Sequence, residues 1–229
     1  MTRKTIISVV LLFLIGIGGA TYWLINYQNQ ETFQKSLITG SANELQQAAE
    51  AVDLSVKDRN RYIRQFQESL EYDKALVLLD RASVKSQINW FYAAQFAPTD
   101  VVAKWLAAGA SVNQLNKNKQ NVLHIATSVN RSVDAYALLV EQATKQQLNQ
   151  KDRFNHTPLY YATMDQNEEA MELLLEAGAS PNLGKDLPIF ETVKQNRKDL
   201  FELLTKHGAT LNRKQVKHLA ETYGSNSFK

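Results

Sequence analysis

The chain has 229 residues, with 26 Lys and Arg against 23 Asp and Glu, so its formal net charge is +3. A nearly balanced chain is unlike a nucleic-acid-binding protein, which needs a strongly basic face. No cysteine is present, which excludes disulfides, thiolate metal ligands and cysteine nucleophiles. The length allows one or two domains.

The first predicted element is an apolar helix over residues 5–25. This stretch carries no charged side chain, and about 20 apolar residues span the hydrocarbon core of a bilayer. Arg3 and Lys4 precede it, whereas the next cation along the chain is Lys35. By the positive-inside rule the N-terminus stays in the cytoplasm and the rest is exported. The sequence therefore predicts residues 1–27 as a signal anchor in a bacterial inner membrane, with the body in the periplasm.

A cleavable signal peptide is the alternative for this segment. Gly18, Gly19 and Ala20 are small residues of the kind that precede a cleavage site. The apolar character continues beyond them to Ile25, which favours the uncleaved anchor. Both interpretations export the body, and a cleaved periplasmic form stays open.

Residues 28–88 are predicted to be helical and to form an N-terminal capping region. Ser41 followed by Glu44 is a capping-box pattern that begins a helix over residues 45–54. Two further helices are expected over residues 57–70 and 72–81. An end unit of this kind shields the core of a repeat array from water.

The body from residue 89 onward contains internal repeats. Residues 105–113, 174–182 and 204–212 read WLAAGASVN, LLEAGASPN and LTKHGATLN. Small residues also recur at spacings of 32, 36 and 30, namely Ala94, Ala126, Ala162 and Thr192. A period near 33 residues with two short helices in each unit is typical of ankyrin repeats.

Residues 150–182 closely resemble an ankyrin repeat. Thr157 and Pro158 suit the start of its first helix, and Gly178 suits the end of its second helix. The other units are more divergent; residues 142–144, for example, read QAT in place of a Gly-containing helix stop. The expected fold is all-α: an ankyrin-repeat solenoid behind an N-terminal transmembrane helix. Residues 89–229 are expected to form four repeats and a C-terminal cap, the cap helix covering residues 212–220.

No catalytic constellation is found in the sequence, and no cofactor, metal site or catalytic residue is predicted. The four histidines belong to no metalloprotease motif, and neither a nucleophile elbow nor a Gly-rich phosphate loop occurs. His124 occupies the place of the ankyrin motif histidine, for which the resemblance implies a structural hydrogen bond. The chain is therefore expected to be a binding protein and not an enzyme.

The resemblance implies that a protein partner binds to the turn fingers and the first helices. The fingers would be residues 116–120, 152–156 and 184–186. Phe154 is the most informative candidate, because the family usually has a polar residue there and an aromatic ring at a turn tip marks an interface. The alternative is that Phe154 packs on a neighbouring finger. The predicted protein-binding residues are Phe154, Arg153, His156, Lys117, Lys119, Lys185, Tyr92, Phe96 and Tyr160, one or two of the aromatic residues being core.

An exported binding module tethered to the membrane suggests an immunity protein that captures a toxic effector, such as a phospholipase delivered by a type VI secretion system. This expectation rests on family and compartment alone. An envelope scaffold or stress-response protein with an endogenous partner is the alternative. A peripheral envelope enzyme with an unrecognised active site is a third interpretation. No nucleic acid is expected as a partner, and the membrane is expected to be contacted through residues 5–25.

Overall fold

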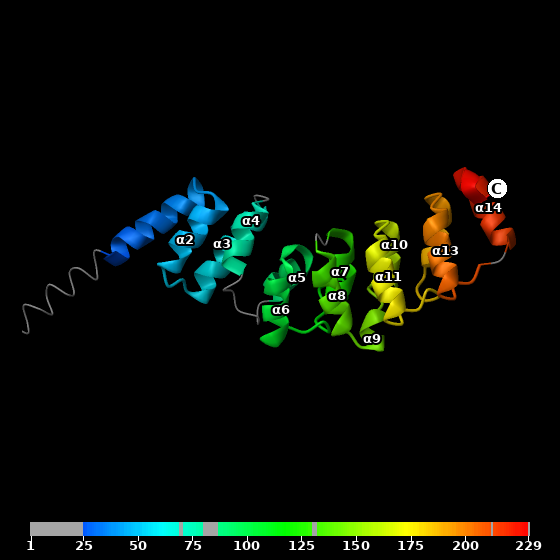
Figure 1. The fold of residues 1–229 in the computed structure, drawn as a ribbon, viewed down its shortest axis with the longest axis horizontal. Helices are drawn as coiled ribbons and strands as arrows, with labels where there is room; N and C mark the ends of the chain where they lie inside the picture. The colour runs from blue at the N-terminus through cyan, green and yellow to red at the C-terminus, as the bar shows by residue number, and fades with distance from the viewer. Residues whose placement is uncertain (1–24, 69–70, 80–86, 130–131, 212, 229) are drawn as a thin grey trace, which may run out of the picture. The chain divides into compact units, whose positions relative to one another are not determined.

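The computed structural model describes residues 25–229 except 69–70, 80–86, 130–131, 212 and 229 (Figure 1). The predicted membrane segment, residues 5–25, lies outside the described residues except at its last position. Across the remaining described residues, no helix is both long and apolar enough to cross a membrane. Every regular element in this part of the chain is helical. The contacts divide the chain into two compact units, residues 1–82 and 83–229.

The first unit is a small helical bundle. Residues 25–38 are helical and are followed by α2 (Ala42–Glu50), α3 (Val56–Glu68) and α4 (Tyr72–Leu79). The predicted capping box begins α2: the Ser41 amide donates to Glu44 Oε2 at 2.7 Å, and the Glu44 amide donates to Ser41 Oγ at 3.3 Å. α4 packs on both α2 and α3. The fully buried side chains include Phe33, Leu45, Ile63 and Phe66.

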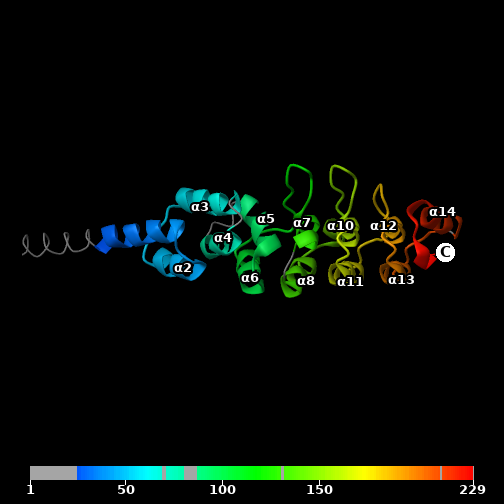
Figure 2. The same cartoon turned by 90° about the horizontal axis from the view of Figure 1, so that it is seen from above.

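The second unit is a stack of helical pairs, as the repeats predict. Its helices are α5 (Gln87–Phe96), α6 (Thr99–Ala107), α7 (Val122–Val129), α8 (Val133–Glu141), α9 (Lys145–Leu148), α10 (Pro158–Met164), α11 (Glu168–Glu176), α12 (Pro188–Lys194), α13 (Lys198–Lys206) and α14 (Arg213–Tyr223), before a 3₁₀ turn (Asn226–Phe228). The first helices of successive repeats pack on one another in the order α5, α7, α10, α12, and α6, α8 and α11 form a second row. Figure 2 shows both rows, with loops rising from the first-helix row.

Helix starts and stops explain why the repeat has this length. The Thr157 hydroxyl accepts a hydrogen bond from the Tyr160 amide, and Pro158 occupies the first turn of α10. Gly178 ends α11 with φ +96°, a conformation that costs an L side chain energy. Small residues at the helix contacts allow close packing, since Ala126, Ala162 and Thr192 are fully buried.

Two departures from the regular repeat have structural explanations. Where residues 142–144 replace the usual helix stop, Thr144 instead caps the additional short helix α9, forming a capping box with Gln147. This helix accounts for the long spacing of 36 residues at that point. At the C-terminal end, α14 packs on α12 in the place that the first helix of a further repeat would take.

Candidate functional site

The candidate site is the row of fingers, which we define as residues 116–120, 150–156 and 184–186. The first two share one turn geometry. Asn116 Oδ1 accepts the amides of Asn118 at 2.8 Å and Gln120 at 3.0 Å. In the next finger, Asp152 Oδ1 accepts the amides of Phe154 at 2.9 Å and His156 at 3.0 Å. Each tip is therefore held by a side chain of its own loop and presents its other residues in a fixed conformation.

The fingers are also bonded to one another. The Arg153 amide donates to the Asn118 carbonyl at 2.8 Å, and the Lys185 amide donates to the Asn155 carbonyl at 2.9 Å. Gly184 lies close to the same carbonyl, because a Cβ built on it would come within 3.1 Å of Asn155 O. These bonds place the three tips side by side, as the loops before α7, α10 and α12 appear in Figure 2.

The third finger is shorter than the other two. Eight positions separate Asn149 from Thr157, the cap of α10, whereas five separate the equivalent residues Asn182 and Leu187. The short loop has no room for the Asx-type turn of its neighbours. Its Lys185 amide is joined to the Asn155 carbonyl, next to Phe154 in the middle finger.

Aromatic rings form a stack along the middle finger. Phe154 lies 6.4 Å from His156 between ring centroids, and His156 lies 4.0 Å from Tyr160 on α10. The Arg153 guanidinium covers one part of the Phe154 ring at 4.6 Å from its centroid. Phe154 nevertheless remains 48% exposed. The prediction of an exposed aromatic tip is confirmed, and the packing partners identified for it belong to its own finger and not to a neighbouring one.

Polar contacts fix the base of this stack. His156 Nε2 lies 2.9 Å from Asp186 Oδ2, which joins the middle and third fingers. Tyr161 Oη donates to Asp152 Oδ2 at 2.6 Å. His124 Nε2 approaches the His156 carbonyl at 3.3 Å. Hydrogen bonds thus hold the rings at several points. These side chains are already ordered, so they would lose less conformational entropy when a partner binds.

The surroundings shift the acidity of these groups. The hydrogen bond with His156 lowers the pKa of Asp186. Burial acts to raise the pKa of Asp152, but the hydrogen bonds from Tyr161 and from the His156 and Phe154 amides outweigh it and leave that pKa lowered. Burial, together with the bond to Asp152, raises the pKa of Tyr161 to about 12. Burial lowers the pKa of His124 to about 4.

The predicted binding residues divide into exposed and buried groups. The side chains of Lys117, Lys119, Arg153 and Lys185 are exposed at the tips. His156, Tyr160 and Phe96 are half-buried. Tyr92 requires correction as a binding residue, because it is buried at 7% exposure and packs against Phe96 with ring centroids 4.8 Å apart. Tyr92 is therefore a core residue of the first repeat. The prediction allowed for one or two core residues among its aromatic candidates.

Three residues of the site were not among the predicted protein-binding residues. Asp186 was placed in a finger without a role, although its spacing of 30 residues from His156 is that of one repeat. Tyr161 is not among the predicted binding residues, although its hydroxyl donates a hydrogen bond to the Asp152 carboxylate. Lys151 lies one residue before the predicted finger and is exposed beside it.

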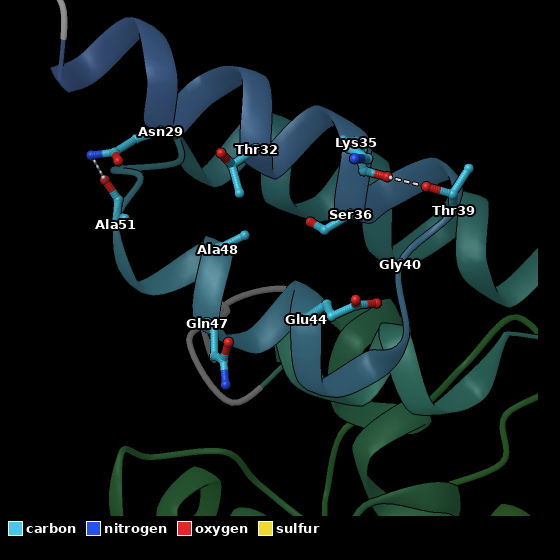
Figure 3. Close-up of a pocket in the computed structure, with 10 residues that line it drawn as sticks. All are labelled: Asn29, Thr32, Lys35, Ser36, Thr39, Gly40, Glu44, Gln47, Ala48 and Ala51. Carbon is cyan, nitrogen blue, oxygen red and sulfur yellow. Dashed lines mark hydrogen bonds between the residues drawn. The ribbon is translucent and has the colours of Figure 1, made fainter.

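The first unit contains a separate polar groove of about 400 Å³ between residues 25–38 and α2 (Figure 3). Two of its polar side chains bond within the unit: Asn29 Nδ2 donates to the Ala51 carbonyl at 3.3 Å, and Thr39 donates to the Lys35 carbonyl at 3.2 Å. Glu44 is engaged with Ser41 in the capping box. Over the described parts of both units, no cluster of His and acidic side chains could hold a metal ion.

Comparison with protein families identifies the repeats. The family model described as ankyrin repeats (3 copies) matches residues 90–185 and 146–215, which together cover more than half of the chain. Proteins of this family are generally non-enzymatic binding modules. Ankyrin repeats imply a protein–protein interaction module, and they suggest a protein as the partner of this chain.

Curated relatives agree with this match. The chain is 29% identical over 150 residues to an ankyrin repeat protein of Acanthamoeba polyphaga mimivirus, a match that covers 62% of this chain and 19% of the relative. It is 39% identical over 83 residues to an ankyrin repeat protein of Rickettsia felis, covering 36% and 27%. It is 31% identical over 120 residues to the mouse B-cell lymphoma 3 protein homolog, covering 49% and 26%. The matches thus span about a quarter or less of these relatives, and the chain belongs to the ankyrin-repeat family.

Proposed function

We propose that this chain is an immunity protein: a binding module, without enzymatic activity, that captures and neutralises a toxic enzyme secreted into the bacterial periplasm. The observation that carries the binding role is Phe154, a 48% exposed ring on a finger whose conformation is fixed by hydrogen bonds. Exposed aromatic residues on rigid loops are typical centres of protein interfaces. The uncharged stretch over residues 5–25, behind Arg3 and Lys4, supports tethering to the inner membrane.

The partner decides between this role and an envelope scaffold. An immunity protein binds one secreted enzyme stoichiometrically, such as a phospholipase, and protects the cell from it. A scaffold binds resident envelope proteins and does not protect the cell from a toxin. Both roles use the same row of fingers, so the partner must be identified directly.

The test is capture of partners by the tagged full-length chain from envelope extract mixed with the product of the neighbouring gene. We expect one stoichiometric hydrolase in the eluate, and we expect Phe154→Ala to reduce its capture at least about tenfold, since interface aromatics contribute about 2 kcal/mol or more. Val133→Ala is the matched control, because Val133 is 52% exposed but begins a second-row helix, α8. Its capture should equal that of the unmodified chain.

Protection of cells supplies the second readout. Cells that produce the toxin in the periplasm should survive with the full-length chain and die when the repeats are confined to the cytoplasm. Equal protection by the cytoplasmic form would refute periplasmic neutralisation. An eluate of several resident envelope proteins would establish the scaffold instead.

A further inference from the structure

The fingers carry a positive charge that the rest of their unit does not. Five exposed cations lie in the three fingers: Lys117, Lys119, Lys151, Arg153 and Lys185. The fingers contain two acids, Asp152 and Asp186, so their formal excess is three positive charges. Residues 83–229 as a whole hold 17 Lys and Arg against 14 Asp and Glu, which is the same excess. The imbalance of this unit therefore resides in its fingers.

The two finger acids are engaged in hydrogen bonds, and only Asp186 also interacts with the charge of a finger cation, the adjacent Lys185. Asp152 is buried and accepts hydrogen bonds from Tyr161 and from two amides of its own finger. Asp186 is engaged with His156. In the part of the chain that the structure describes, none of the five finger cations forms an ion pair. Backbone hydrogen bonds place these cations on neighbouring loops, and their combined charge points to an anionic binding partner.

The opposite charge lies on a different surface of the same repeat. α11 exposes four glutamates along its length, Glu168, Glu169, Glu172 and Glu176. A nucleic acid carries negative phosphates along its whole length, and those that reached α11 would be repelled by these glutamates. This disfavours nucleic acid as the ligand. A protein segment can instead present carboxylates to the fingers alone. It can also supply an apolar side chain for the half-exposed ring of Phe154.

We propose that the row of fingers binds an acidic segment of the partner protein, whose carboxylates pair with the finger cations while an apolar side chain between them packs on Phe154. This inference rests on the proposed protein-binding function and adds the chemistry of the partner. The Arg153 guanidinium, stacked on Phe154, is placed to bridge the two kinds of contact. Charge pairs on exposed loops act mainly on association and on selectivity, and the aromatic contact supplies a large share of the affinity.

The experiment uses the full-length chain in detergent and a fluorescein-labelled peptide of four Glu-Glu-Phe-Glu units, followed by fluorescence anisotropy. We expect binding that weakens as the salt concentration rises, because the contacts are solvent-exposed. The combined variant Lys117→Glu, Lys119→Glu, Arg153→Glu and Lys185→Glu should weaken it at least about tenfold. The control variant Lys145→Glu, Lys198→Glu, Lys206→Glu and Lys214→Glu changes the net charge equally at exposed sites outside the fingers. It should weaken binding less than about twofold.

The aromatic contact is tested with a second peptide in which Ser replaces each Phe. The loss of affinity caused by this replacement should be large for the unmodified chain and small for Phe154→Ala, as expected for two groups that contact each other. Equal weakening by both charge variants would overturn the proposal. So would binding of a 16-nucleotide oligothymidylate that is tighter than binding of the peptide and depends on the same cations.

The outcomes for this inference and for the proposed function are separable. Capture of a toxic hydrolase that is unaffected by the finger charge reversal would leave the immunity role standing and reject the acidic segment. Finger-dependent binding of the peptide, with only resident envelope proteins captured, would support the acidic segment and reject the immunity role.

Discussion

His124 is buried at 1% exposure, and each of its ring nitrogens has a polar neighbour. Nδ1 lies 2.7 Å from Asn121 Oδ1 and 3.1 Å from the Asn121 amide nitrogen, while Nε2 faces the His156 carbonyl. Burial disfavours the imidazolium and lowers its pKa to about 4. The ring therefore acts as a neutral link between the second repeat and the middle finger, in agreement with the structural role implied by the resemblance.

This buried histidine predicts a pH dependence of stability. Between the unfolded pKa of about 6.5 and the folded pKa of about 4, the unfolded chain binds a proton that the folded chain does not. The free energy of unfolding should therefore fall by about 3 kcal/mol as the pH drops through this window, at about 1.4 kcal/mol per pH unit. Urea unfolding of the unmodified chain and of His124→Gln checks this contribution.

The variant should start less stable at neutral pH and lose less stability on acidification. His218→Gln, which removes an exposed histidine, serves as the control for the substitution itself. An identical slope for His124→Gln would contradict the assignment of this pH dependence to His124.

At the same scale, the sequence predicted which site residues are exposed better than how they are connected. Phe154 stood out because an aromatic ring at a turn tip has no core to fill. The contact of His156 with Asp186 depends on the short third finger, which brings residues of two loops together. Tyr92 could not be recognised as a core residue because α5 has no clear apolar face: the residues from Trp90 to Ala94 are all buried.

Among the elements, the second helices depend on their C-terminal glycines. Gly178 has φ +96°, and a Cβ built on it meets nothing within 4 Å, so its cost would come from the backbone alone. Gly178→Ala should therefore lower the free energy of unfolding by about 1–2 kcal/mol. Gly178→Asn should cost less, because Asn tolerates the left-handed conformation.

Denaturant unfolding of the three proteins gives the order Gly, Asn, Ala from most to least stable. An alanine variant as stable as the unmodified chain, or more stable than the asparagine variant, would contradict a strained stop at this position. Each of these substitutions leaves the fingers intact and should not alter partner capture once the protein is folded.

The pattern of small residues and helix stops predicted paired helices, and the second unit consists of such pairs. It did not predict α9, because the sequence showed only that the usual glycine was missing and not that Thr144 and Gln147 would cap a new helix. The helical residues 25–38 were not predicted as an element of the first unit either. Their packing side chain Phe33 contacts Tyr62 of α3, a long-range contact that local periodicity does not contain.

At the scale of the whole molecule, sequence and structure inform different parts of the chain. The prediction of export rests on residues 1–27, which lie almost entirely outside the described residues, and the prediction of binding rests on the fingers. Once the repeats are aligned, the sequence alone shows that the excess cations of residues 83–229 lie in the fingers and that many of the acids lie in the second helices. The engagement of both finger acids could not have been inferred from the sequence, because it depends on the hydrogen bonds of Asp152 and Asp186.

The C-terminal helix α14 closes the stack, and several contacts hold it there. Ser225 Oγ donates to the Val193 carbonyl, the Ser227 amide donates to Asn196 Oδ1 at 2.9 Å, and Phe228 packs on Phe201 with ring centroids 5.1 Å apart. Without this cap, the side chains of the last repeat that α14 covers would become exposed to solvent. In a solenoid each repeat contacts only its neighbours, so the loss should decline with distance along the stack.

Deletion of residues 213–229 should therefore destabilise the repeats unevenly. We expect amide hydrogen exchange to speed up most in α12 and α13, less in α10 and α11, and least in α7 and α8, since only the last repeat loses contacts directly. Exchange measured by mass spectrometry on the full-length and truncated chains gives this gradient, with α7 and α8 as the internal control. A uniform increase across all repeats would mean that the stack opens as one cooperative unit, and no increase in α12 would mean that α14 is not its cap.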